Sequence, residues 1–312
     1  MMTSSTHWSV TAPCFSEEDE KQEKATMSEE EVEQSWADMH GKCAVLDDEE
    51  IVKRGLDEME KELNEISCDE KPALLMAETR CPDQCSSEHK RLFLRREAFD
   101  AERAARRLVD YWQQKLKWFG PEKSFIPLAL DNAMREDTAA LNRGLLRLLP
   151  VTDSFGRCIL FCDISLHDAT MYSMESMMRA IWYMLLAAIE DETTQNRGAI
   201  FVLYLKQSTL DQFDRKLLHR LLELEDKFVP IRFRSFHICH PGACFDIERP
   251  ILQFLLGKRL RARMDVHQGT EEEVLIELDE YGMPPDRVPS IMGGKVVLDH
   301  ERWLSNRRSL RL

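Results

Sequence analysis

The stretch HICHPGACF, residues 237–245, brings together residue types that bind metal ions. His237, Cys239, His240 and Cys244 are all potential zinc ligands through imidazole nitrogens and thiolates. If the chain up to Cys239 forms a β-strand, alternation places His237 and Cys239 on one face and His240 on the other. The candidates would then point to two sides of a sheet, which favours a strand that ends at a Pro-Gly turn over a metal site.

A structural zinc site would need a second pair of ligands from elsewhere in the chain. Cys81, Cys85 and His89 could supply that pair, but they precede the 237–245 stretch by about 150 residues, unlike the ligand pairs of compact zinc modules. The sequence therefore predicts no metal and no other cofactor. Metal-dependent activity at the Cys/His cluster remains an alternative.

Motifs with which many parallel-sheet enzymes bind phosphates or activate a nucleophile are absent from the sequence. It contains no G-x-G-x-x-G, no Walker A loop and no G-x-S-x-G elbow. The Gly pair of IMGGKVVL (291–298) follows a proline-rich loop rather than a strand. We therefore expect a protein that is not an enzyme.

An apolar segment, CFDIERPILQFLLG at residues 244–257, follows the Pro-Gly turn and is expected to be a helix with charges only in its first turn. Such a helix is either buried on all sides or faces something apolar, a ligand or a bilayer. Cations follow it within six residues and also occupy one face of the preceding strand; we call this set the basic strip: Arg232, Arg234, Lys258, Arg259, Arg261 and Arg263. The basic strip suits an anionic membrane surface. The alternative is an ordinary solvated face that pairs with the acidic N-terminal segment.

Charge is unevenly distributed along the 312 residues. The net charge is −14, and residues 1–90 carry −15 while the rest carries +1, so nucleic acid is not expected as a partner. Residues 1–45 are rich in Ser, Glu and Lys and are predicted to be disordered. No secretory signal is expected, and the longest apolar stretch, 177–189, is broken by Arg179. With an odd number of cysteines, nine, these features favour a cytoplasmic protein that touches membranes only peripherally.

The remaining pattern predicts helices followed by alternating strands and helices. Apolar residues at helical spacing predict helices over 47–66 and 99–120, the latter starting at Asp100 and ending at Gly120-Pro121. Strands are expected within three segments: 152–165, 198–207 and 231–239. Helices are expected at 174–192, 210–228 and 270–282. This alternation is typical of an α/β domain with a mainly parallel sheet.

Six segments, in this order, resemble the CRAL-TRIO family of lipid-binding proteins, which includes cellular retinaldehyde-binding and alpha-tocopherol transfer proteins. They are RLFLRREAFDAERAARRLVDYW (91–112), DSFGRCILFC (153–162), RGAIFVLYLKQSTLDQF (197–213), VPIRFRSFHICHPGACF (229–245), PILQFLLGKRLRARMDVHQG (250–269) and VPSIMGG (288–294). The resemblance implies a helical N-terminal unit at 46–120 packed on an α/β lipid-binding domain at 128–300. A basic tail would follow at 301–312. A mobile gate helix, about Cys244–Leu256, would close the lipid pocket.

The resemblance also implies roles for particular residues. Pocket and gate residues would be Phe161, Val202, Tyr204, Phe236, Ile238, Phe245, Ile247, Ile251, Phe254 and Leu255. Residues in contact with phosphoinositide membranes would be Arg234, Lys258, Arg259, Arg261 and Arg263. Glu97 stands where the family often has a second arginine. The sequence also departs from the family at Tyr204, Gln207, Ile231 and His240, which argues against phosphatidylinositol as the ligand in the pocket.

We therefore expect a non-catalytic protein that binds and transfers a hydrophobic lipid or isoprenoid-like ligand. It would contact anionic membranes, with phosphatidylinositol bisphosphate as one candidate headgroup. The alternative is a regulatory interaction module on the same fold, whose pocket is filled by its own side chains.

Overall fold

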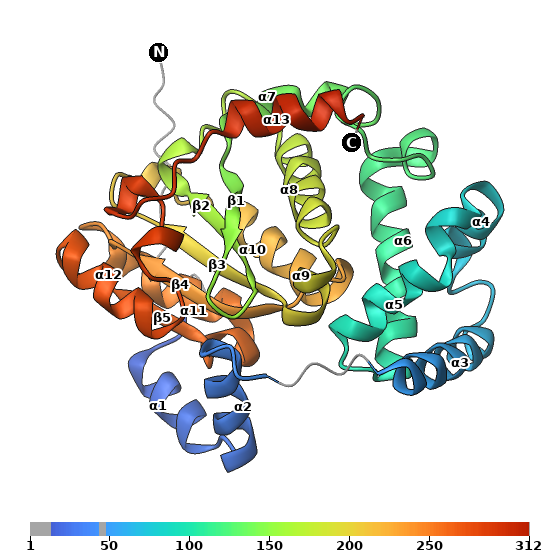
Figure 1. Ribbon diagram of the computed structural model, residues 1–312, viewed down its shortest axis with the longest axis horizontal. Helices are drawn as coiled ribbons and strands as arrows, with labels where there is room; N and C mark the ends of the chain where they lie inside the picture. The colour runs from blue at the N-terminus through green and yellow to red at the C-terminus, as the bar shows by residue number, and fades with distance from the viewer. Residues whose placement is uncertain (1–13, 44–47, 312) are drawn as a thin grey trace.

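A five-stranded sheet lies at the centre of the computed structural model, which describes residues 14–43 and 48–311 (Figure 1). Its strand order follows the chain: β1 (Leu146–Thr152), β2 (Cys158–Asp163), β3 (Ala199–Tyr204), β4 (Phe233–Cys239) and β5 (Met264–His267). Strand β1 pairs with β2 in antiparallel orientation, and the other neighbours pair in parallel. The predicted α/β fold with a mainly parallel sheet is confirmed. The sequence pattern did not predict β1 and β5.

Sequential parallel strands decide which helices share a face of the sheet. Because crossover connections are right-handed, strands added in one direction place their connecting helices on one side. These helices are α8 (Met174–Ala188), α9 (Glu192–Arg197), α10 (Arg215–Glu223) and α11 (Phe245–Arg261). Side chains of α8, α10 and α11 share one apolar cluster with this side of the sheet, which we call the crossover face. The opposite side, the α12 face, packs against α12 (Glu271–Glu280) and the segment that follows it.

A helical unit precedes the sheet and lies at the right of Figure 1. It consists of α3 (Glu49–Glu65), α4 (Pro72–Arg80), α5 (Ser87–Arg96) and α6 (Ala101–Lys123), and α7 (Thr138–Arg143) then leads into β1. As predicted, Asp100 caps α6, accepting a hydrogen bond from the backbone N–H of Arg103, and Gly120 interrupts it with φ 71°. Tyr111 and Trp118 of α6 contact Trp182 of α8. Short 3₁₀ or π turns join the elements: η1 (Pro82–Cys85), η2 (Arg135–Asp137), η3 (Ile164–Leu166), η4 (Leu210–Gln212), η5 (Leu224–Phe228), η6 (Pro285–Arg287) and η7 (Ser290–Met292).

Both ends of the chain contain helices that the sequence analysis missed. Disorder was predicted over 1–45, but the described part forms α1 (Glu17–Ala25) and α2 (Glu29–Met39), which pack beside β4 and α11 (Figure 1). Residues 1–13 and 44–45 of that prediction lie outside the described residues. The predicted basic tail includes α13 (His300–Ser309). Local caps and tertiary ion pairs stabilise segments whose composition alone offers little to bury.

The cysteines and the helix lengths bear on the expected class of protein. All nine cysteines carry free thiols. Among residues 14–43 and 48–311, no helix combines the length and the apolar character that crossing a membrane requires.

Substitution of the α6 cap tests the contribution of this helix to stability. Asp100→Ala should lower the free energy of unfolding by about 1 kcal/mol, because the N–H of Arg103 loses its acceptor. Denaturant titration followed by circular dichroism measures this loss. Glu102→Ala, in the first turn of the same helix, is the control and should change stability less; equal losses would contradict the capping role.

Candidate functional site

Helix α11, the predicted gate, presents two different apolar faces. Phe245, Leu252 and Leu256 are buried toward the crossover face, and Leu255 is partly buried against the same cluster. The predicted pocket residue Ile251 is also buried, but it does not belong to that cluster. The predicted gate residues Ile247 and Phe254 point outward and are 53% and 43% exposed. They are seven residues apart and therefore lie on one side of the helix.

The end of the gate is marked by a backbone break. Gly257 has φ 68° and ψ 161°, which are not helical values, and interrupts α11 between Leu256 and Lys258. A glycine adopts this conformation without the steric cost that a Cβ would bring. The predicted gate, about 244–256, therefore coincides with the helical segment before the break.

Only some of the strand residues predicted to line the pocket face α11. Phe236 and Ile238 lie on the crossover face, as required. Phe161, Val202 and Tyr204 belong to the cluster on the α12 face, away from α11. On the crossover face, which α11 covers, the side chains of β2 and β3 are instead Leu160, Cys162, Phe201 and Leu203. Both faces of this sheet are apolar. The sequence pattern therefore did not reveal which alternate residues of β2 and β3 face α11 and which face α12.

The HICH stretch holds a buried hydrogen-bond chain on the α12 face. His237 Nδ1 lies 2.9 Å from Nε2 of His267, His237 Nε2 lies 2.9 Å from Oγ of Ser235, and His267 Nδ1 lies 2.9 Å from Oε2 of Glu277. Burial lowers the pKa of His237 well below its usual value, so its ring is neutral. Burial raises the pKa of the Cys239 thiol, which disfavours a thiolate ligand.

His240 and Cys244, the other two candidate metal ligands, are not part of this hydrogen-bond chain. His240 has φ 51° and its ring packs edge-on to Tyr204 of the α12 face, so the prediction that it points to the opposite side from His237 is wrong. Because the backbone of His240 is left-handed, the alternation of side chains along β4 ends at Cys239 and does not extend to His240. Cys244 begins α11. Within the described part of the chain, no three His, Cys, Asp or Glu side chains are grouped as metal ligands.

The basic strip is assembled at one edge of the sheet by strand direction. Since β5 runs parallel to β4, the two strands begin at the same edge. Arg232 and Arg234 at the start of β4 therefore lie beside Arg263 at the start of β5. The end of α11 supplies the other cations of the basic strip. Arg259 belongs to α11, whereas Arg263 lies beyond the end of this helix at Arg261.

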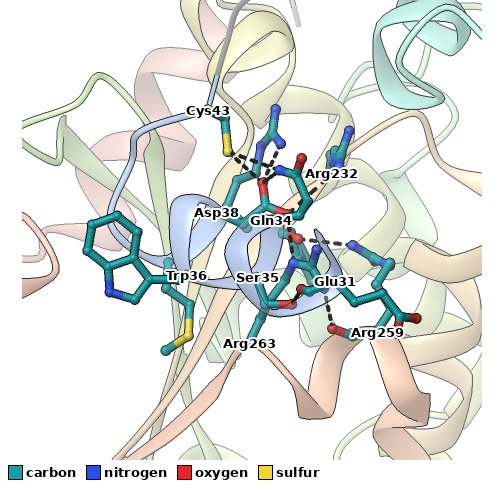
Figure 2. A network of polar contacts seen from close by, with 12 residues as sticks. Glu31, Gln34, Ser35, Trp36, Asp38, Cys43, Arg232, Arg259 and Arg263 are labelled. Carbon is teal, nitrogen blue, oxygen red and sulfur yellow. Dashed lines mark hydrogen bonds and ion pairs between the residues drawn. The ribbon is translucent and has the colours of Figure 1, made fainter. Parts of the chain in front are cut away.

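Asp38, at the end of α2, lies at the centre of the basic strip (Figure 2). Its carboxylate oxygens are 2.6 Å from Nη1 of Arg234 and 2.6 Å from Nε of Arg263, and Arg232 Nη2 is 3.8 Å away. The Asp38 side chain is fully buried. Although burial opposes ionisation, the arginines, Arg234 first, hold the pKa of Asp38 at about 2. Arg234 and Arg263 are themselves buried rather than open to solvent.

Two further cations of the basic strip also pair with the N-terminal helices. Lys258 Nζ is 2.7 Å from Glu31, and Arg261 Nη2 is 2.6 Å from Glu23. The alternative reading, in which the basic strip pairs with the acidic N-terminal segment, therefore describes these contacts. Sequence reasoning missed the helices that present the acids, although the capping boxes SEED (16–19) and SEEE (28–31) were a readable signal.

Arg259 has a different partner, from within the α/β domain. Its guanidinium lies 2.6 and 2.8 Å from the two carboxylate oxygens of Glu225. Glu225 is fully buried and also binds Arg96 and the backbone N–H of Phe233. Burial alone would raise the pKa of Glu225, but Arg259 and Arg96 keep it below its usual value. The contact between Glu225 and Arg96 of α5 joins the helical unit to the α/β domain.

A groove of about 380 Å³ opens beside the backbone break of α11. Leu255, Leu256 and Gly257 line one side of the groove. His219 of α10 and Lys227 of the π turn η5 line another. Lys258 and Arg259 also border it. The groove therefore joins the gate to the basic strip.

The neutral state of His237 predicts a pH dependence of stability. Because the pKa of His237 is lowered in the folded protein, only the unfolded chain takes up this proton below pH 6.5. Stability should be complete above pH 6.5 and fall by up to about 1.4 kcal/mol for each pH unit below it. His237→Gln should show a shallower decline in denaturant titrations, whereas the exposed His219→Gln should follow the unsubstituted protein. Identical slopes for all three proteins would exclude this role.

The chain is similar in sequence to a known domain family and to several known proteins. Residues 142–294 match the family model of the CRAL/TRIO domain. The chain is 30% identical to clavesin-2 of Homo sapiens, covering 65% of this chain and 62% of clavesin-2. It is 26% identical to an alpha-tocopherol transfer protein-like protein of Mus musculus, covering 68% and 59%, respectively.

Two further matches are more limited. The chain is 24% identical to tyrosine-protein phosphatase non-receptor type 9 of Mus musculus over 51% of this chain and 26% of that protein. The chain thus matches less than two thirds of the length of each of these three relatives. A crystal structure of Sfh5 aligns with a TM-score of 0.49 and 8% identity, covering 85% of this chain and 99% of Sfh5.

Proposed function

Since the chain carries a CRAL/TRIO domain over residues 142–294, we propose that it binds a hydrophobic lipid or isoprenoid-like ligand beneath α11 and exchanges it at an anionic membrane. The observation that carries this proposal is the division of α11 into an inward apolar face and an outward apolar face, Ile247 and Phe254, beside the basic strip. A gate that opens at a membrane needs both faces. The role is non-catalytic.

The apolar layer between the crossover face and α11 supports the ligand part of the proposal. Leu203, Phe236 and Ile238 form its floor, and Phe245, Leu252 and Leu255 lie on the gate side. Transfer of an apolar ligand into such a layer is favoured by about 25 cal/mol for each Å² removed from water. The groove beside Gly257 offers an opening next to the gate.

The outward side of α11 supports the membrane part. Exposed apolar side chains beside a row of cations suit an interface where apolar groups enter the acyl region and cations meet headgroup phosphates. We propose Arg234, Lys258, Arg261 and Arg263 as the headgroup contacts, with phosphatidylinositol bisphosphate as the lipid. Arg259 contributes to the same field while bound to Glu225. The nine free thiols are compatible with a cytoplasmic location.

A second candidate function is a regulatory interaction module whose pocket is filled by its own side chains. Aromatic packing under the gate favours it: Phe201 stacks on Phe236 at 4.9 Å and contacts Phe233, and all three are buried. Lipid mass spectrometry of extracts from the purified protein separates the two functions. A bound lipid in stoichiometric amount supports transfer. Protein that stays ligand-free after incubation with lipid vesicles supports the interaction module.

Polar substitutions on the outward face of α11 test the membrane contact. Ile247→Ser with Phe254→Ser should weaken binding to phosphatidylcholine vesicles containing phosphatidylinositol bisphosphate by roughly tenfold or more, because two large apolar side chains no longer enter the bilayer. Co-sedimentation measures the partition.

The control replaces two apolar residues away from the gate that are more exposed than Ile247 and Phe254. Ile276→Ser with Val297→Ser should leave vesicle binding unchanged, since Ile276 belongs to α12 on the opposite side of the sheet and Val297 follows the segment that packs there. Equal binding by the gate variant and the unsubstituted protein would refute the proposed contact.

A further inference from the structure

The acidic leader, which we define as residues 14–43 with α1 and α2, contacts both the gate and the basic strip. Helix α1 lies against α11, and α2 lies against β4 and contacts Arg263, the residue before β5 (Figure 1). These are the two parts that the proposed function requires to be free at a membrane. The leader therefore covers the surface that membrane contact would use.

The contact of α2 is centred on the carboxylate of Asp38, which lies among arginines that could equally bind a phosphate. Asp38 is bound by Arg234 and Arg263, with Arg232 nearby (Figure 2). Without Asp38, three guanidinium groups would face one another in a largely buried site, which is unfavourable unless another anion replaces the carboxylate. Arginine binds carboxylate and phosphate with the same planar arrangement of donors. The site is thus filled by one anion at a time.

The contact of α1 restrains the gate itself. The backbone N–H of Phe15 donates to the carbonyl of Pro250 at 3.0 Å, and its ring lies 4.0 Å from the guanidinium of Arg261. Glu20 accepts a hydrogen bond from Gln253 at 2.7 Å and lies 3.5 Å from Arg249. Because these contacts reach the middle of α11, the helix cannot move outward while α1 stays in place.

We propose that the acidic leader is an intramolecular inhibitor: it occupies the basic strip and fastens the gate, and an anionic membrane surface displaces it. This inference rests on the proposed function and adds its regulation. The pairs Glu31–Lys258 and Glu20–Arg249 are partly exposed, so they are weak and screened by salt. A membrane that presents many phosphates competes with them effectively, and release of α1 then frees the gate.

Neutralising the acids of the leader in the full chain tests the inhibition. The variant Glu23→Gln, Glu31→Gln, Asp38→Asn keeps side-chain size, and glutamine at position 31 keeps the capping box of α2. It should bind phosphatidylcholine vesicles containing phosphatidylinositol bisphosphate roughly tenfold more tightly than the unsubstituted protein, since the cations of the strip are no longer occupied. Circular dichroism and thermal unfolding verify its folding.

The charge-matched control is Glu18→Gln, Glu30→Gln, Glu33→Gln. These exposed acids lie on the same two helices, and the structure shows no ion pair for them among the described residues. The control should bind like the unsubstituted protein. A second variant, Glu23→Gln with Glu31→Gln, leaves Asp38 in place and should show an intermediate gain, which keeps the test available if substitution of Asp38 prevents folding.

Hydrogen exchange reports displacement directly. Backbone amides of α1 and α2 in the unsubstituted protein should exchange faster when these vesicles are added, and phosphatidylcholine vesicles alone should have no effect. Equal vesicle binding by all variants, with unchanged exchange in α1 and α2, would overturn the inhibition and leave the membrane proposal intact. Absence of binding by every variant would overturn both.

Discussion

The direction of the crossover connections is the constraint on which the rest of the structure depends. Four strands run parallel in chain order, so right-handed connections place α8, α10 and α11 on one face. The same arrangement brings the starts of β4 and β5 to one edge of the sheet. The apolar layer and the basic strip are thus products of a single topology, and they meet at α11.

Two buried carboxylates make that basic edge stable. Glu225 lies within the α/β domain and pairs with both Arg259 and Arg96. Asp38 comes from the leader, nearly two hundred residues away in sequence from Arg234. Removing one partner of a buried ion pair is costly because the other charge stays desolvated. Glu225 belongs to the same domain as its arginines and stays with them. Asp38 can leave with the leader, provided that another anion takes its place beside the arginines.

Much of the fold could be predicted because its signals are local. Asp100 as a helix cap, Gly120-Pro121 as its interruption and the apolar run of β3 depend on neighbours in sequence. The gate helix also followed from a continuous apolar segment bounded by a turn and by cations. Strand β5 was missed because four residues between a helix and a loop carry too short a pattern. The leader was missed because its composition resembles that of disordered segments.

For the site, residue types were determined by the sequence and their neighbours by the tertiary structure. The sequence by itself determined that an apolar helix precedes a run of cations, and that His237 and Cys239 share a strand face. Only the tertiary structure decided that Phe201 and Leu203, rather than Val202 and Tyr204, face the gate layer, because a sheet buried on both sides is apolar in either phase. It alone decided that Asp38 fills the basic strip, since long-range charge pairing leaves no periodic trace along the chain.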